Sequence, residues 1–250
     1  MRGDFEAYLS ANYQGRQFTL EELLAWEDEA GVDVAVVMPN TEVVPKNREL
    51  GETLKVNKRT LGCALINPCT GDAAVKEIRS AIRDWGLRGM KLMPVIHKYA
   101  IDDPMVDGVM RAARELGIIV SIHSGPDNCH PTRIGNLAKR FPEITVIMDH
   151  MGLPDNLPEG VEAAQQNKNI SLGTTILRFH KRWGNDPNAV VPTEVKAAID
   201  KLGPERVVFG SNMPEYRPIQ VMDALRRLNI GPEAEKLIFG ENLKRIYGLK

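Results

Sequence analysis

Short apolar runs alternate with amphipathic segments along most of the sequence, and this alternation limits the folds that the chain can adopt. Runs rich in β-branched residues stand at 32–38, 61–66, 87–92, 118–123, 144–150, 170–174 and 207–211. Such runs suit strands that are buried on both faces, as in a parallel sheet covered by helices. Most steps between them are about 25 to 30 residues long, which is the length of one strand-plus-helix unit. The pattern predicts a parallel α/β fold.

The segments between the runs have the apolar spacing of amphipathic helices. They lie at residues 72–85, 104–116, 132–140 and 193–202, and residues 218–229 and 233–247 supply the closing helices. Ahead of the first run, Thr19 and Glu22 form a capping box, in which each side chain satisfies a free backbone amide at the start of a helix. We expect that helix to stop at Gly31, because glycine readily takes the left-handed conformation.

Seven strands in 250 residues leave two architectures, a doubly wound open sheet or an eight-stranded barrel. No glycine-rich phosphate fingerprint follows the first strand, so we expect no nucleotide cofactor. We therefore predict a (β/α)8 TIM-barrel fold that forms a single domain over residues 1–250. Residues 1–15 contain no strand-like run, so the first barrel strand is expected to be missing or irregular, with residues 1–18 as an irregular N-terminal segment.

Charge and composition exclude several classes of partner. A formal net charge of −1 gives no reason to expect binding to nucleic acid or to an anionic membrane. No apolar run approaches the roughly 20 residues of a membrane span. The three cysteines lack the spacing of a zinc ribbon or a redox pair, which indicates a reduced, cytoplasmic setting. The expected partner is a small-molecule substrate, and the exposed edges of an incomplete barrel would favour a homo-oligomer.

Two of the five histidines end consecutive apolar runs, IIVSIH at residues 118–123 and ITVIMDH at residues 144–150. In parallel α/β folds, ligands bind where the strands end. One histidine at a strand end is more often structural, but two at matching ends favour a functional site. Side chains alternate across a strand, so Asp149 is expected to point toward the helix layer or the loop. The predicted polar ring at the barrel mouth consists of Asn67, Lys91, His123, His150, Thr174 and Asn212.

Six motifs together resemble the amidohydrolase-related (amidohydrolase-2) family. They are GVD from residue 31, GLRGMKLMP from 86, IHSG from 122, DHMG from 149, VVFGSNMP from 207 and FGENL from 239. Their order and spacing follow the family from about Thr19 to the end of the chain. The resemblance implies a (β/α)8 barrel of the amidohydrolase superfamily. Its members hydrolyse C–N or C–O bonds, often in cyclic carboxylates, or decarboxylate aromatic acids.

The resemblance also implies roles for individual residues. His123 matches a metal ligand on the fifth strand, and His150 matches a sixth-strand histidine that binds or orients substrate or water. Lys91 matches a fourth-strand lysine, which in other branches is carboxylated and bridges two metal ions. Asn212 stands where the family usually has a proton-shuttling aspartate, and an amide cannot accept the proton of an attacking water. The family's first-strand His-x-His pair has no counterpart in this sequence.

These observations lead to a hypothesis and two alternatives. We expect an enzyme that hydrolyses a C–N or C–O bond in a small, carboxylate-bearing substrate. The candidate residues are His150, Asn212 and Lys91 for catalysis, Lys91, Arg133, Asn67 and Thr174 for substrate binding, and His123 and His150 for a divalent metal such as zinc. One alternative is a decarboxylase of the same family. The other is a catalytically degenerate barrel that binds a small molecule or a protein.

Overall fold

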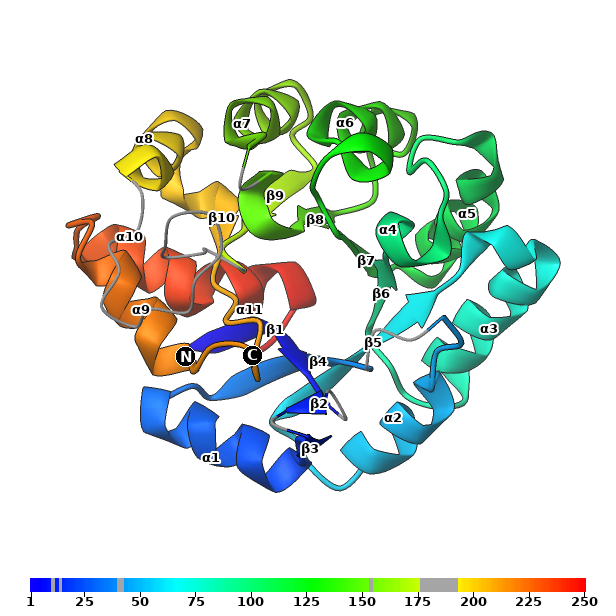
Figure 1. Cartoon of the computed structure of the whole chain (residues 1–250), viewed down its shortest axis with the longest axis horizontal. Helices are drawn as coiled ribbons and strands as arrows, with labels where there is room; N and C mark the ends of the chain where they lie inside the picture. The colour runs from blue at the N-terminus through cyan, green and yellow to red at the C-terminus, as the bar shows by residue number, and fades with distance from the viewer. Residues whose placement is uncertain (10–11, 14, 40–42, 153–154, 176–192) are drawn as a thin grey trace.

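Eight parallel strands form the predicted barrel, as a computed structural model of the chain shows (Figure 1). The structure describes residues 1–9, 12–13, 15–39, 43–152, 155–175 and 193–250. Neighbouring strands in the sheet follow one another along the chain, apart from a small antiparallel hairpin of β2 and β3. The strands are β1 (Gly3–Tyr8), β2 (Asn12–Tyr13), β3 (Arg16–Gln17), β4 (Val34–Met38), β5 (Thr60–Ile66), β6 (Gly89–Leu92), β7 (Ile119–Ile122), β8 (Val146–Met148), β9 (Ile170–Gly173) and β10 (Val207–Val208).

Helices surround the ring of strands (Figure 1). In α1, the predicted capping box of Thr19 and Glu22 is present, and Gly31 ends the helix in the left-handed conformation. None of the helices in the described ranges is long and apolar enough to cross a membrane. The helices are α1 (Leu20–Ala30), α2 (Asn47–Leu54), α3 (Asp72–Arg83), α4 (Pro94–His97), α5 (Asp107–Leu116), α6 (Pro131–Arg140), α7 (Leu157–Gln166), α8 (Thr193–Leu202), α9 (Pro218–Arg226), α10 (Pro232–Lys236) and α11 (Asn242–Tyr247).

The first barrel strand is present, so it is not missing, but a bulge between Asp4 and Ala7 makes it irregular, which was the other expectation. Strand β1 pairs with β4 on one side, and its Phe5 amide donates to the carbonyl of Phe209 at 2.9 Å on the other side, which closes the circle. The sequence concealed β1 because Asp4 and Glu6 break its apolar pattern, although both carboxylates are fully buried. Buried charges of this kind need partners, and those partners come from distant strands.

A bulge in β1 decides which of its side chains face the barrel interior. Asp4 pairs with Ala35 and Ala7 pairs with Val37, so three steps along β1 lie opposite two steps along β4. An extra residue of this kind interrupts the regular alternation of side chains. Phe5 consequently packs in the barrel interior, while Ala7 packs in the layer between the strands and the helices.

The barrel interior is filled below the mouth by apolar side chains. Gly173 and Gly210 make room for Phe5, whose ring would lie 3.2 Å and 3.3 Å from a methyl group placed on these two glycines. Because apolar side chains fill this part of the interior, the polar groups lie at the carboxyl ends of the strands. The interior cluster consists of Phe5, Tyr8, Val36, Met38, Cys63, Ile119, Ile147, Val208, Leu243 and Tyr247, the last two from α11.

Candidate functional site

Two imidazole rings meet at the carboxyl ends of β7 and β8. Atom Nε2 of His150 lies 2.9 Å from Nδ1 of His123, and the rings are inclined by 73°. Nδ1 of His150 lies 3.2 Å from the carbonyl oxygen of Thr175. Nδ1 of His150 also lies 2.8 Å from Oγ1 of Thr175, so Thr175 can accept from this nitrogen through its carbonyl or donate to it through its hydroxyl. The hydrogen bond between the facing nitrogens requires one proton between the two rings.

The backbone after β8 is what turns His150 toward His123. His150 and Met151 both have positive φ angles, 63° and 56°, in the turn Asp149–Gly152. Residues other than glycine seldom adopt this conformation, and it persists only where surrounding contacts enforce it. The amide of His150 donates to Oγ1 of Thr175 at 3.1 Å, and the amide of Gly152 donates to Oγ of Ser124 at 3.0 Å. Side chains from neighbouring strand ends thus hold the turn.

Asp149 faces the barrel interior, and the expectation that it points to the helix layer was wrong. Ile147, two residues earlier on β8, belongs to the interior cluster, so alternation places Asp149 on the same face. The turn then brings His150 to the mouth as well. Oδ1 of Asp149 accepts from Oγ of Ser121 at 2.8 Å, and Oδ2 accepts from Nζ of Lys91.

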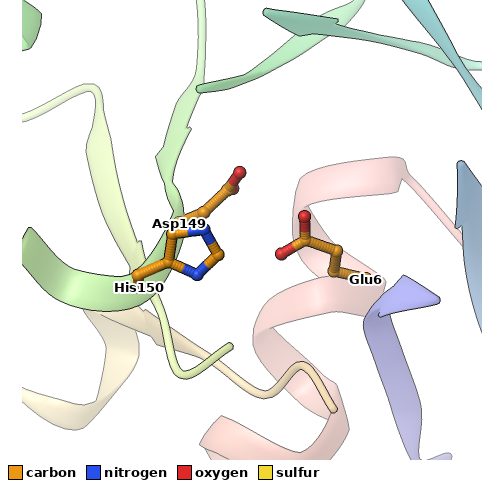
Figure 2. Close-up of side chains that lie close together, drawn as sticks. All are labelled: Glu6, Asp149 and His150. Atoms are coloured by element: carbon orange, nitrogen blue, oxygen red, sulfur yellow. The ribbon is translucent and has the colours of Figure 1, made fainter. Parts of the chain in front are cut away.

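Glu6 completes a buried ionic cluster that the sequence did not reveal. Nζ of Lys91 donates to Oε1 of Glu6 at 2.5 Å, and the same oxygen accepts from the hydroxyl of Tyr8 at 2.5 Å. The other oxygen, Oε2 of Glu6, is buried and has no hydrogen-bond partner among the described residues. Figure 2 shows the Glu6 carboxylate directed across the barrel at Asp149 and His150. Lys91 thus lies in the interior, as predicted, but its ammonium group is held by two carboxylates.

Burial and charge act in opposite directions on these groups. Burial raises the pKa of Asp149 to about 7, with the nearby charge of Glu6 adding to the effect. Burial also works to raise the pKa of Glu6, but Lys91 and His150 outweigh it and lower that pKa to about 2. Burial alone would lower the pKa of Lys91, yet Asp149 and Glu6 raise it. The cluster therefore favours a charged lysine and an ionised glutamate, and Asp149 is the more easily protonated of the two acids.

The remaining predicted site residues are held by other contacts. Oδ1 of Asn67 accepts from the amide of Cys69 at 3.1 Å, and Oγ1 of Thr174 accepts from the amide of Gly210 at 3.2 Å. Asn212 has a positive φ of 61°, and its Nδ2 donates to Oε2 of Glu215 at 2.9 Å. Arg133 lies on α6 with its side chain 45% exposed, and it pairs with Asp102 at 2.7 Å. None of these contacts joins Arg133 to the ionic cluster.

The donors at the mouth fit a divalent metal ion. Single donor atoms of Glu6, Asp149 and His150 lie within 4.8 Å of one another. Asp149 is engaged by Lys91 and Ser121, whereas the second oxygen of Glu6 has no partner among the described residues. The group consists of two carboxylates and an imidazole, a set that zinc and other divalent ions accept. The contact of His150 Nδ1 with a backbone carbonyl is the usual second support of such a ligand.

Several solved structures share this fold at low sequence identity. A 5-carboxyvanillate decarboxylase from Sphingomonas paucimobilis superposes with a TM-score of 0.76 at 17% identity, covering 100% of this chain and 99% of that one. A probable 2-pyrone-4,6-dicarboxylic acid hydrolase from Acinetobacter baumannii, solved with citric acid, gives 0.76 at 14%, covering 99% of each chain. A dihydroxybenzoic acid decarboxylase from Polaromonas sp. JS666, solved with manganese and 2-nitroresorcinol, gives 0.73 at 13%, covering 99% of this chain and 96% of that one.

The sequence itself supplies the assignment to a family. Comparison with curated proteins gives no match. The amidohydrolase family, in contrast, matches residues 1–249, which is nearly the whole chain and includes β1 and the cluster at the barrel mouth. The chain belongs to the amidohydrolase family.

Proposed function

We propose that the chain is an enzyme that hydrolyses a C–N or C–O bond in a small substrate bearing a carboxylate. The observation that carries the proposal is the contact of 2.9 Å between His150 Nε2 and His123 Nδ1 at the barrel mouth. Hydrolysis requires a group that takes a proton from water and returns it to the leaving group. Two imidazoles that share a proton can perform both steps in sequence, because one ring accepts while the other donates.

The position of the pair supports this role. His123 is partly exposed at the mouth, whereas His150 is 4% exposed and fixed by Thr175. The outer ring can therefore take a proton from water and return it to the leaving group, while the inner ring stays hydrogen-bonded to it and stabilises its charged form. Asn212 supplies no carboxylate base, so the histidine pair takes the task that the family usually gives to an aspartate at that position.

A divalent ion fits beside this pair. Glu6, Asp149 and His150 would hold it, with Lys91 balancing the carboxylate charge, and His123 would then remain the ring that transfers protons. When bound there, the ion supplies Lewis-acid polarisation of a substrate oxygen. The structures with a similar fold include one solved with manganese, which supports testing manganese beside zinc.

The substrate carboxylate needs a donor other than Lys91. Both Glu6 and Asp149 already accept from its ammonium group, so little of that charge remains for a substrate. Asn67, Thr174 and Arg133 remain the predicted substrate-binding residues.

Decarboxylation is the second candidate, and Asp149 favours it. A buried aspartic acid with a pKa of about 7 can carry a proton at neutral pH, and loss of carbon dioxide requires proton delivery to carbon. Two of the structures described above are decarboxylases of aromatic acids.

Isotope labelling of the product distinguishes hydrolysis from decarboxylation. The protein, loaded with manganese or zinc, is incubated with two panels, cyclic lactone or lactam carboxylates and hydroxybenzoates. Hydrolysis in water labelled with oxygen-18 places one labelled oxygen in the product. Decarboxylation in deuterium oxide releases carbon dioxide and places deuterium on the carbon that lost it. The lead proposal fails if the consumed substrates release carbon dioxide and gain no labelled oxygen from water.

A further inference from the structure

The amide side chain of Asn212 is held in one orientation. Its Nδ2 donates to Oε2 of Glu215 at 2.9 Å, and the backbone amide of Glu215 donates to the carbonyl of Asn212 at 3.1 Å. An ionised carboxylate only accepts hydrogen bonds, so the nitrogen end of the Asn212 amide must face Glu215. The oxygen end, Oδ1, is then directed away from Glu215. Within the described part of the chain, no group donates to this oxygen.

The backbone places Asn212 at the barrel mouth. Gly210 faces the interior, because a methyl group on it would lie 3.3 Å from the ring of Phe5. Side chains alternate along an extended segment, so Asn212, two residues later, lies on the same face. The amide of Asn212 also donates to the carbonyl of Glu6 at 2.9 Å. Asn212 therefore stands beside the candidate site, with its Oδ1 available to a bound molecule.

An amide oxygen in this position selects a ligand that carries a hydrogen-bond donor. A neutral amide takes no proton from water, so Asn212 recognises a group and leaves proton transfer to the histidines. The ring N–H of a cyclic amide, or lactam, can donate to Oδ1. The ring oxygen of a lactone has only lone pairs, so it would leave Oδ1 without a donor. Sites that hydrogen-bond a substrate N–H discriminate strongly against an analogue that lacks it.

We infer that Asn212 determines specificity and that the substrate is a cyclic amide that bears a carboxylate and a free ring N–H. The inference rests on the proposed hydrolysis and narrows it to the C–N bond. Glu215 is a positioning residue, since it acts through the amide of Asn212.

The reaction that this substrate undergoes needs no reagent besides water. The water oxygen bonds to the ring carbonyl carbon while His123 takes one of the water protons. The C–N bond then breaks, and His123 returns that proton to the ring nitrogen. The products are an amine and a carboxylic acid, whose proton passes to the amine in solution.

A matched pair of ligands tests the role of Oδ1. Pyroglutamate and the γ-lactone of α-hydroxyglutarate share ring size and carboxylate, but the first has a ring N–H where the second has a ring oxygen. Each is titrated calorimetrically into the zinc-loaded wild type. We expect the lactam to bind at least about tenfold more tightly, and N-methyl pyroglutamate, which lacks the donor, to bind no better than the lactone. A lactam that binds no more tightly than the lactone, or does not bind, overturns the inference.

Substitutions at the two positions test the orientation of the amide. Asn212 has a φ of 61°, which glycine adopts without strain, so Asn212→Gly removes the amide and keeps the backbone. This variant should bind lactam and lactone equally, and a surviving preference contradicts the inference. Glu215→Gln can donate as well as accept, which allows the Asn212 amide to turn over. It should weaken the lactam severalfold and leave the lactone unchanged, whereas equal losses for both ligands would refute the positioning role.

A third measurement requires no ligand. Asn212→Asp places a second carboxylate beside Glu215, where like charges repel, so its melting temperature at neutral pH should fall below that of the wild type. Combining Asn212→Asp with Glu215→Gln removes the repulsion and should recover the wild-type value. If Asn212→Asp alone melts with the wild type, the two side chains do not face each other and the inference fails.

Hydrolysis assays separate this inference from the proposed function. Turnover of lactones without turnover of lactams would overturn the inference and leave the proposed hydrolysis standing. If neither ring is opened while the lactam still binds preferentially through Asn212, the proposed hydrolysis fails and the recognition of a ring N–H stands.

Discussion

Nε2 of His150 lies 2.9 Å from Nδ1 of His123, although the two residues belong to the ends of different strands. The contact depends on a left-handed turn at His150, since a continuing strand would have sent this side chain toward the helices. Residues other than glycine rarely adopt this backbone conformation, and here it brings the two imidazole rings together. Four predictions follow from this arrangement and from the buried acids around it.

The histidine pair is expected to govern turnover. His150→Asn or His123→Asn removes one half of the proton-sharing pair, and general acid–base catalysis commonly contributes about 100-fold or more to rate. We expect turnover to fall by about that factor, with circular dichroism and melting temperature near those of the wild type. His130→Asn is a matched control, because His130 caps α6 through its contact with the amide of Thr132. Rates that survive His150→Asn on a verified substrate would remove the proposed role.

Glu6 is expected to govern metal affinity independently of turnover. Glu6→Gln removes the buried negative charge that faces the histidines, so manganese should bind at least about tenfold more weakly in a calorimetric titration. Tyr8→Phe removes only the hydrogen bond to Oε1 of Glu6 and keeps the charge. This variant should lose less affinity. Equal affinities in the wild type and in Glu6→Gln would place the ion elsewhere.

Glu27 is expected to make the fold less stable as pH rises. This residue of α1 is 1% exposed, and burial, followed by the proximity of Asp4, raises its pKa well above the ordinary value of 4.5. The folded chain keeps the proton where the unfolded chain loses it, so stability is full below pH 4.5 and declines above it. One such proton changes the free energy of unfolding by about 1.4 kcal/mol per pH unit.

Glu27→Gln tests this expectation, because glutamine can still donate to Asp4 but has no proton to lose. Urea denaturation at several pH values above 4.5 should give a shallower decline than in the wild type. Asp4 keeps part of the slope, since burial raises its pKa to about 7. The same change at the exposed Glu52 should reproduce the wild-type curve. An unaltered slope in Glu27→Gln would show that Glu27 is ionised in the folded chain.

The turn that carries His150 is expected to require a glycine at position 160. A methyl group on Gly160 of α7 would lie 2.3 Å from the carbonyl oxygen of Met151, too close for either backbone to accept. Gly160→Ala should cost about 1–3 kcal/mol and also reduce turnover by displacing the turn. Gly108→Ala in α5 is the control, because its nearest neighbour would lie at 3.6 Å. It should be neutral or stabilising by up to about 1 kcal/mol. Undiminished turnover in Gly160→Ala would separate the turn from catalysis.

Much of the barrel could be predicted because its strands repeat one local pattern. Seven apolar runs correspond to β4 through β10, and the capping box at Thr19 is observed. Strand β1 could not be recognised, since its buried Asp4 and Glu6 resemble the charges of an exposed segment until their partners are known. The charge of Glu6 is answered by Lys91, which lies 85 residues further along the chain.

Residues of the candidate site could be predicted only where a polar residue stands within or directly after an apolar run. His123 and His150 follow apolar runs and do meet, and Lys91 lies in the interior. Asp149 was assigned to the wrong face because the strand was expected to continue to His150, and Thr175 was not recognised because it meets His150 only through the turn with positive φ angles after β8. A histidine or methionine gives no local indication of that conformation. The assigned roles of these residues remain predictions until the substitutions are made.

The closure of the barrel brings residues that are far apart in the sequence together at the candidate site. The amide of Ser211 donates to Asp4 across 207 positions, and the amide of Asn212 donates to the carbonyl of Glu6 at 2.9 Å. Contacts between residues so far apart along the chain carry a larger loop-closure entropy than local contacts do, so we expect this seam between β1 and the segment after β10 to form late in folding.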